Sequence, residues 1–482
     1  MARAFRQQTA AGNATISQQF RSPKFMTLSD PVSLLLLQSA RTGNYPQAVN
    51  ALKRGAQVNI TDAEGTTALM FAAQRGAIQI VDLLITAGAD VNIHRRQFGT
   101  TALMFAAAAN RGAIVNRLLA AGADVNGTNE DGSTALMGAT LANAVDIVTM
   151  LIAAGADVKQ IDTAGDNTLN IAISNDRSQL VELLLAAGAD ACYRRSDDGK
   201  TPLLLIPAAG DVRMLELLLA AGANLQAVDN AGESLLLIAA ERGDSNLIQP
   251  LIRAGAKIDL QNHDGWTPLI AAVAAGQIEI VTALLTAGAD PNLQSHDLET
   301  ALHLAAIEGD IDLIRLLLAR GANPDRITDL GDTPLVLAAL HEHTAAVAAI
   351  LAAGIDLSTH QQGVTAFGLA IVNGSVEIAR ILLDAGVSLL QTFKDGQTPL
   401  MIAAMHGNLD LVRSLITAGA AIDLQDDTGA TALMWATHRQ YPEVVELLLS
   451  VGANRSCKNL GGLTALDLAK MNGNRQSIDL LS

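Results

Sequence analysis

The sequence has few aromatic residues and no long apolar run. Aromatic side chains account for 3% of its 482 residues, although 50% of the residues are hydrophobic. A helix that crosses a bilayer needs about 20 consecutive apolar residues, and runs such as 34–37 and 203–206 are far shorter. We therefore predict no membrane span, and the composition favours an interior of small and aliphatic side chains.

Motifs of catalysis and cofactor binding are also missing. The chain has no Cys-x-x-Cys pair, no Walker-type glycine loop and no Gly-x-Ser-x-Gly elbow. His341 and His343 are the nearest approach to a metal-binding pair, but residues two apart do not share a face of a helix. We therefore expect no enzymatic activity, no cofactor and no metal site.

Basic residues are too few for a nucleic-acid-binding protein. The chain has 32 Lys and Arg against 48 Asp and Glu, a formal net charge of −16. Nucleic-acid binding normally requires a basic face, so the composition argues against that class of partner. We interpret most of the acidity as a solvated surface; if it contributes to recognition, it favours basic partners.

One repeated unit makes up most of the chain. A glycine recurs at steps of 33 residues in nine cases, 34 in two and 32 in one, with Leu298 at one of these positions. The glycines are Gly65, Gly99, Gly132, Gly165, Gly199, Gly232, Gly265, Gly331, Gly363, Gly396, Gly429 and Gly462. Two residues after this position the chain has Thr or Ser in every unit except one, which has Asn167.

The unit predicts a pair of helices. Thr at this position caps a first helix, and Pro directly after it suits the first helical turn. A stripe of Leu and small Ala residues follows, which lets neighbouring helices approach closely. A second helix with an Ile/Val-x-x-Leu-Leu run ends in Ala-Gly-Ala-Asp or a near variant, as at Gly88, because glycine tolerates the left-handed conformation that ends helices.

Units of 33 residues that open with Thr-Pro-Leu, as at 267–269, resemble the ankyrin repeat over residues 32 to 482. The resemblance implies an all-α fold with short β-hairpin loops, an α-solenoid wound into a curved superhelix. No helix pair buries its own apolar face, but stacked neighbours share one core. We expect a single solenoid over 31–482, with an N-terminal cap at 31–60, twelve repeats at 61–457 and a C-terminal cap at 458–482.

Residues 1–30 differ from the rest, with four basic residues and one acid, Asp30. We interpret them as a disordered leader; a targeting segment and a true start at Met26 are the alternatives. Cys192 and Cys457 lie in loops eight units apart and cannot meet in a stacked array, which excludes an intramolecular disulfide and favours a reducing, cytoplasmic location.

Several units depart from the pattern. Asn167 and Asn170 predict a looser fourth repeat, and Pro207 and Pro250 should each bend or shorten a helix by removing a backbone donor. The family usually has His after Thr-Pro-Leu, where it bonds to nearby loops, but only His303 keeps it here. Met70, Met104, Met137, Met401 and Met434 take that position in five units, and we interpret them as core filling.

The resemblance places recognition on the concave side, formed by hairpin tips and the exposed face of the first helices. Trp266 directly follows a hairpin glycine and is a candidate hot-spot residue, whereas Trp435 is expected in the core. The two loops with an inserted residue each carry an arginine pair, for bidentate contacts to carboxylates or phosphates or for pairing with nearby acids such as Asp197. The full set of candidate binding residues is Arg95, Arg96, Phe98, Arg194, Arg195, Trp266, Leu330, Leu340, His341, Val372, Met405, His406 and His438.

These observations favour a monomeric scaffold or adaptor that grips a segment of a partner protein along its concave face. A preformed surface of this kind loses little entropy on binding. The alternative is a regulatory or anchoring subunit that inhibits or localises a partner enzyme.

Overall fold

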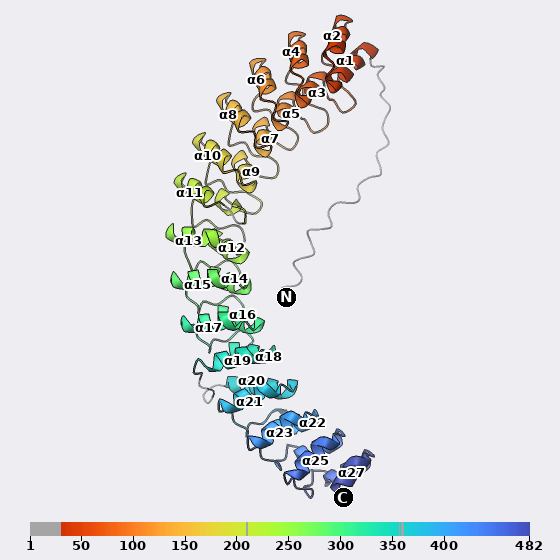
Figure 1. Cartoon of the computed structure of the whole chain (residues 1–482), viewed down its shortest axis with the longest axis vertical. Coiled ribbons are helices and arrows are strands. Elements are labelled where there is room, and N and C mark those ends of the chain that lie inside the picture. The colour runs from red at the N-terminus through yellow and green to blue at the C-terminus, as the bar shows by residue number, and fades with distance from the viewer. Residues whose placement is uncertain (1–29, 209–210, 356, 358–360) are drawn as a thin grey trace. The chain divides into compact units, whose positions relative to one another are not determined.

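The computed structural model describes residues 30–208, 211–355, 357 and 361–482. It divides into two compact units, Met1–Ala164 and Gly165–Ser482. The described residues form 27 α-helices and two short 3-10 helices (Figure 1), which confirms the prediction of an all-α repeat fold. Apart from Asp30, the predicted leader lies outside the described residues.

In the first unit four helix pairs stack side by side. The first helices pack on one another in one row and the second helices in another, with the loops beside the first row (Figure 1). The pairs are α1 (Pro31–Thr42) with α2 (Tyr45–Lys53), α3 (Ala68–Arg75) with α4 (Ile78–Thr86), α5 (Ala102–Ala108) with α6 (Gly112–Ala120), and α7 (Ala135–Leu141) with α8 (Val145–Ala153).

The second unit repeats the same two-row arrangement. Its elements are α9 (Thr168–Ser174), α10 (Ser178–Ala186), η1 (Pro202–Leu205), α11 (Val212–Ala220), α12 (Leu235–Arg242), α13 (Ser245–Arg253), α14 (Pro268–Ala274), α15 (Ile278–Thr286), α16 (Ala301–Glu308), α17 (Ile311–Ala319), α18 (Pro334–Leu340), α19 (Thr344–Leu351), α20 (Gln361–Asn373), α21 (Val376–Asp384), η2 (Lys394–Gly396), α22 (Pro399–Met405), α23 (Leu409–Thr417), α24 (Ala432–His438), α25 (Pro442–Ser450), α26 (Ala465–Met471) and α27 (Arg475–Leu481).

The predicted caps and small-residue stripes form these helices. Thr267 Oγ1 accepts from Ile270 N at 3.2 Å and caps α14, with Pro268 in the first turn. On α3, Ala72 and Ala73 are fully buried between neighbouring helices. Because these side chains are small, adjacent first helices pack without large core residues. The second helix ends where Gly88 takes the left-handed conformation, with φ of 84°.

The hairpin loops are held by side-chain and backbone hydrogen bonds, and β structure among the described residues is limited to two isolated bridges. Asp62 Oδ1 accepts from Glu64 N and Thr66 N, which closes the turn before Gly65. Gln97 N in the next loop donates to Glu64 O at 3.1 Å. The loops of successive repeats are thereby joined to one another as well as to their own helices.

Leu298 takes the place of a hairpin glycine without changing the turn. Its φ is 57°, in the left-handed region, and its side chain is 43% exposed. A side chain in this conformation costs about 1–2 kcal/mol relative to glycine, so the backbone of this loop is determined by its neighbours rather than by Leu298 itself.

The two prolines act differently. Pro207 forces Ile206 into an extended conformation, with ψ of 124°, and the first helix of that repeat is reduced to the four residues of η1. The prediction for Pro207 is confirmed. Pro250 lies inside α13, which keeps the nine residues of its counterparts. Of the predicted bending or shortening, the shortening does not occur. Leu247 and Leu251 remain buried on the core side, and these apolar contacts hold the helix.

In the fourth repeat, Asn167 replaces the capping Thr in function as well as in position. Its Oδ1 accepts from Asn170 N at 2.9 Å, and α9 reaches the usual seven residues. Asn170 is completely buried, and its Nδ2 donates to Asp166 Oδ1 at 3.3 Å while its Oδ1 has no partner among the described residues.

The repeat that contains Gly363 departs most from the prediction. We expected a hairpin glycine at 363 and a capping Thr at 365, but α20 runs from Gln361 through both positions. An Asp or Asn three residues before the glycine closes the turn in several repeats, as Asp62 does. Arg96 and Phe393 hold this position in two other repeats whose first helices still begin after the capping Thr.

The expectation of apolar links between repeats is correct in part. Met70 and Met401 are buried, but each sulfur also accepts from the capping residue, Thr67 N at 3.4 Å and Thr398 N at 3.3 Å. His303 Nδ1 accepts from Thr300 N at 3.0 Å in the same way, and its Nε2 donates to Arg326 O in the following loop at 3.0 Å. Methionine therefore keeps the hydrogen bond from the capping residue, and His303 adds a second hydrogen bond to the loop of the next repeat.

Candidate functional site

The first helices of the second unit present one side that no other described element covers. The residue four after the cap is buried or partly buried on this side, and the residue three further on is more open, because positions three apart share a helix face. Trp435, partly buried, and His438, exposed, are such a pair on α24. We name the second position on five successive first helices the open row: Leu340, Val372, Met405, His438 and Met471, all exposed except Met405.

The open row is apolar for most of its length. Leu340 is 44% exposed, Val372 is 53% exposed and Met471 is 70% exposed. Met405 is partly buried and His438 is exposed. Helices α18, α20, α22, α24 and α26, which carry these residues, contact one another in that order, so the row is continuous along the stack.

The other members of the predicted strip lie beside this row. Leu330, at a hairpin tip, is 83% exposed. His341 is exposed and stacks on His343, with ring centroids 6.2 Å apart. His406 is exposed, and its Nδ1 lies 2.9 Å from Ile402 O of its own helix. The predicted strip residues from Leu340 to His438 thus lie on or directly after first helices that contact one another in succession, and Leu330 is exposed in the loop before α18.

Sequence reasoning missed Met471 and Leu141, which is 58% exposed. The final repeat was interpreted as a polar cap because charged and amide residues surround Met471 in the sequence. The signal that could have found both is their position, three residues after the partly buried slot of the first helix.

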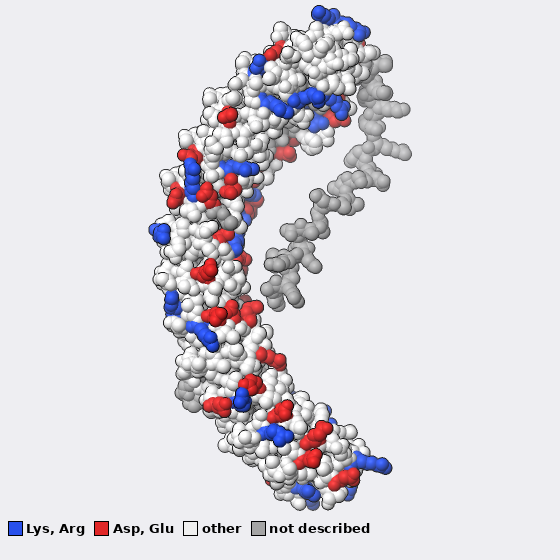
Figure 2. All heavy atoms as spheres, in the orientation of Figure 1, with Lys and Arg blue, Asp and Glu red and all other residues white. Residues whose placement is uncertain are grey.

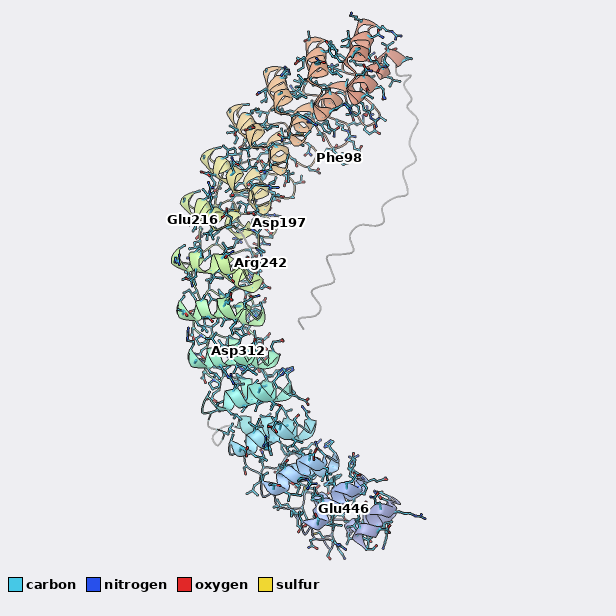
Figure 3. The ribbon with its side chains drawn as sticks, viewed as in Figure 1. Phe98, Asp197, Glu216, Arg242, Asp312 and Glu446 are labelled. Carbon is cyan, nitrogen blue, oxygen red and sulfur yellow. The ribbon has the colours of Figure 1, made fainter. Side chains whose placement is uncertain are left out.

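The first arginine pair lies in the loop between α4 and α5. Arg95 is partly buried, and its Nε donates to Thr66 Oγ1 of the preceding loop at 3.0 Å. Arg96 is exposed, and Phe98 is 50% exposed at the loop tip (Figure 3) with a left-handed φ of 69°. An exposed guanidinium and an exposed ring thus lie in one loop.

The second arginine pair, Arg194 and Arg195, forms its contacts within the chain. Arg195 contacts three carboxylates: Asp166 at 3.0 Å, Asp197 at 2.8 Å and Asp198 at 3.4 Å. The hydrogen bond from Arg195 holds the pKa of the Asp197 carboxyl well below its usual range. Asp197 is exposed and labelled in Figure 3.

Arg194 donates to Val228 O at 2.6 Å and to Asn230 Oδ1 at 3.0 Å. Of the two interpretations of this pair, pairing with nearby acids is the one that the contacts of Arg195 favour. The surrounding face of the second unit carries many acidic side chains (Figure 2).

Trp266 is partly buried, whereas we expected an exposed side chain. Its backbone N donates to Asn262 Oδ1 at 2.8 Å, which fixes it in the hairpin. The same loop position is Glu233 in the repeat before and Glu299 in the repeat after. Burial raises the pKa of both carboxyls, and the neighbouring carboxylates Asp229 and Asp297 add to the effect.

Trp435 is not the core residue that we expected, because it is partly exposed on the side of α24 that carries the open row. Its Nε1 donates to Asp426 Oδ2 at 2.7 Å, and its ring meets that of His438 edge-on at 6.2 Å. The expectation failed because the aligned Phe71 and Phe105, taken as core, are partly exposed as well. A pocket of about 190 Å³ opens beside Trp435, lined also by Met434.

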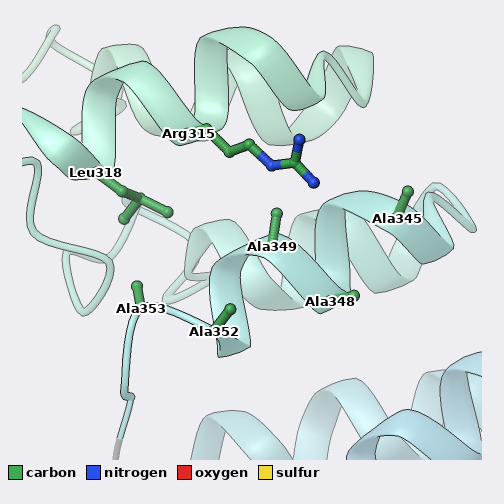
Figure 4. Close-up of a pocket in the computed structure, with 7 residues that line it drawn as sticks. All are labelled: Arg315, Leu318, Ala345, Ala348, Ala349, Ala352 and Ala353. Carbon is green, nitrogen blue, oxygen red and sulfur yellow. The ribbon is translucent and has the colours of Figure 1, made fainter.

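A larger hollow, of about 420 Å³, lies on the second helices (Figure 4). It is lined by five alanines of α19 and the residues that follow, together with Leu318 and Arg315 of α17. It exists because α19 carries alanine where other second helices carry larger residues. A groove of this origin has no arrangement of polar groups for a ligand.

The described residues contain no group of three or more His, Cys, Asp or Glu side chains placed to hold a metal ion. Likewise, none of the described helices is long and apolar enough to pass through a membrane. Cys192 and Cys457 are free thiols.

The model of the family described as ankyrin repeats (3 copies) matches the chain in ten overlapping stretches that run from residue 36 to 482. The chain is an ankyrin-repeat protein. Ankyrin repeats are generally modules of protein–protein interaction and are typically not enzymes. Among curated proteins, none matches this ankyrin-repeat chain.

Proposed function

We propose that this ankyrin-repeat protein is a scaffold or adaptor that binds a segment of a partner protein along the open side of its first helices and hairpin loops. The observation that carries the proposal is the open row, in which Leu340, Val372 and Met471 are 44%, 53% and 70% exposed on stacked helices. Contiguous exposed apolar surface is typical of interaction sites. Helices that are already packed lose little entropy when a partner docks.

The test is capture of partners by the tagged full-length protein, identified by mass spectrometry. Val372→Asp with Met471→Asp places two charges in the open row and should reduce recovery of the bound partner at least about tenfold. Because both side chains are exposed, the fold should be unchanged, which circular dichroism verifies.

A matched control places the same charge elsewhere. Ile278, 41% exposed, begins α15, and Val451, 38% exposed, follows α25, so both belong to the second-helix row. Ile278→Asp with Val451→Asp should leave recovery unchanged. If both double variants lose partner recovery equally, or if neither loses it, the open row is not the binding surface.

The same proposal places the protein in the cytoplasm, as a monomer, with no catalytic step of its own. The two free thiols suit a reducing compartment. Light scattering of the purified protein tests the monomer, and turnover of any substrate by the protein alone would contradict the non-catalytic role. If the captured partner is an enzyme whose activity changes on binding, the regulatory alternative replaces the scaffold.

A further inference from the structure

The open side of the first helices contains a pocket beside Trp435. Met434, Trp435 and His438 of α24 and Leu468 of α26 form its apolar and aromatic walls, and Thr428, Ala430 and Asn459 of the adjoining loops complete the lining. Its volume is about 190 Å³, and an apolar cavity of about 150 Å³ already accepts a benzene-sized group. The pocket therefore has room for one side chain of leucine or phenylalanine size.

The tryptophan wall of the pocket is held in place through Asp426. Asp426 is 6% exposed; its Oδ1 accepts from Thr428 N and Ala430 N, both at 2.9 Å, and from Thr428 Oγ1 at 2.6 Å. The second oxygen, Oδ2, accepts from Trp435 Nε1 at 2.7 Å.

His438 is held through Asn472, whose Nδ2 donates to His438 O at 3.0 Å. The same Nδ2 lies 3.5 Å from Nδ1 of the His438 ring. The indole of Trp435 is thus held in place before a ligand binds, and a ligand does not have to order it.

The rim of this pocket differs in charge from the unit that contains it. Residues 165–482 hold 19 basic and 37 acidic residues, whereas residues 426–482 hold five basic and six acidic ones. Lys458 and Lys470 are both exposed, and both help to lower the pKa of Asp467, after its stronger hydrogen bonds from Thr464. Lys458 directly precedes the lining residue Asn459, and Lys470 follows the lining residue Leu468 by two positions, which places both lysines on segments that form the pocket.

Most of the acidic side chains near the rim accept hydrogen bonds from residues of their own loops. Asp467 Oδ2 accepts from Thr464 N at 3.0 Å and from Thr464 Oγ1 at 2.7 Å, and Asp426 is saturated as described above. Asp423 and Asp427 are exposed acids in the same loop, and Asp423 Oδ1 accepts from Asn454 N at 2.9 Å. Within the described part of the chain, neither Lys458 nor Lys470 forms an ion pair, so both charges are available to a ligand.

We infer that the pocket takes a leucine- or phenylalanine-sized side chain of a partner segment whose flanking residues are acidic. The inference rests on the proposed function and specifies the chemistry of the segment. Apolar contact with Trp435 and Leu468 supplies the anchor, and Lys458 and Lys470 attract the flanking carboxylates. Tryptophan is enriched among the residues that carry most of the binding energy at protein interfaces.

The test begins with a displayed library of short peptides, panned on the full-length protein and depleted on the Trp435→Ala variant. We expect the enriched peptides to share an apolar residue beside Asp or Glu. Synthetic peptides with the enriched sequences and with both termini blocked are then titrated into protein labelled with fluorinated tryptophan. The chain has two tryptophans, and Trp266→Phe assigns the two fluorine resonances.

The expected result is a shift of the Trp435 resonance alone. Replacing the apolar residue of the peptide by Ala, or its acids by Lys, should weaken binding by about tenfold or more. Lys458→Glu with Lys470→Glu, two exposed sites that leave the fold intact, should weaken it similarly, while the control Arg253→Glu with Lys257→Glu should not.

Enrichment of basic peptides, no dependence on Trp435, or equal effects of the two charge-reversal pairs would overturn the inference. If partner capture still depends on the open row but not on Lys458 and Lys470, the proposed function stands and this inference fails. If capture is insensitive to the open row, the proposed function fails independently.

Discussion

His303 should remain neutral in the folded protein well below pH 6. It is completely buried. Its Nδ1 accepts from Thr300 N at 3.0 Å, and its Nε2 donates to Arg326 O at 3.0 Å. A second ring proton would lie on Nδ1, facing the Thr300 N–H donor, and would break that bond. Burial accordingly lowers the pKa of His303 to about 4, from about 6.5 in an unfolded chain.

The sign of the pH effect follows from these two pKa values. As the pH falls below about 6.5 the unfolded chain takes up a proton that the folded chain does not accept until near its own lower pKa. The contribution of His303 to stability is therefore complete above the unfolded pKa and is lost as the pH falls toward the folded one. At about 1.4 kcal/mol per pH unit, the difference between the two pKa values is worth about 3 kcal/mol.

His303→Met tests this, since methionine occupies the position in five other repeats. The variant should lose the bond to the Arg326 carbonyl, at a cost of about 1 kcal/mol at pH 7. Between about pH 6.5 and 4.5 its urea midpoint should fall less steeply than that of the wild type. His341→Met, at an exposed site, is the control.

An NMR titration of the imidazole provides the direct reading. The expected result is no protonation of His303 in the folded protein near pH 6. A His303 resonance that titrates near 6.5 in the folded protein, or identical pH profiles for wild type and variant, would refute the reasoning.

Three further changes test the fold, each by the shift of the urea midpoint. Leu298→Gly should stabilise by about 1 kcal/mol, because it removes a left-handed non-glycine residue; a destabilised variant would contradict this. Thr267→Ala removes the cap of α14 and should cost about 1 kcal/mol, while the exposed Thr282→Ala should cost less. Trp435→Phe leaves Asp426 Oδ2 without its donor and should cost about 2 kcal/mol, and a neutral result would show that the bond is not formed in solution.

The repeat was predictable because its signals are local. Thr267, Pro268 and the alanines that follow specify a capped, closely packed helix, and the structure has it at Pro268–Ala274. Pro207 acts locally too, through the conformation of the residue before it, so the loss of its helix could be predicted. Pro250 could not be judged in this way, because packing of Leu247 and Leu251 outweighs the missing donor.

The candidate site was harder to predict from the sequence than the repeat fold. Trp435 occupies a slot shared with Phe71 and Phe105, and apolar identity alone does not distinguish a core slot from a partly open one. Arg194 and Arg195 could be recognised as a pair, but their acceptors lie up to 36 residues away.

Amide hydrogen exchange of the full-length protein with and without a captured partner tests the central proposal most directly. The account predicts that protection gained on binding is confined to the exposed ends of α18, α20, α22, α24 and α26 and to the hairpin loops beside them. Protection that falls instead on the second helices α19, α21, α23 and α25 would contradict it.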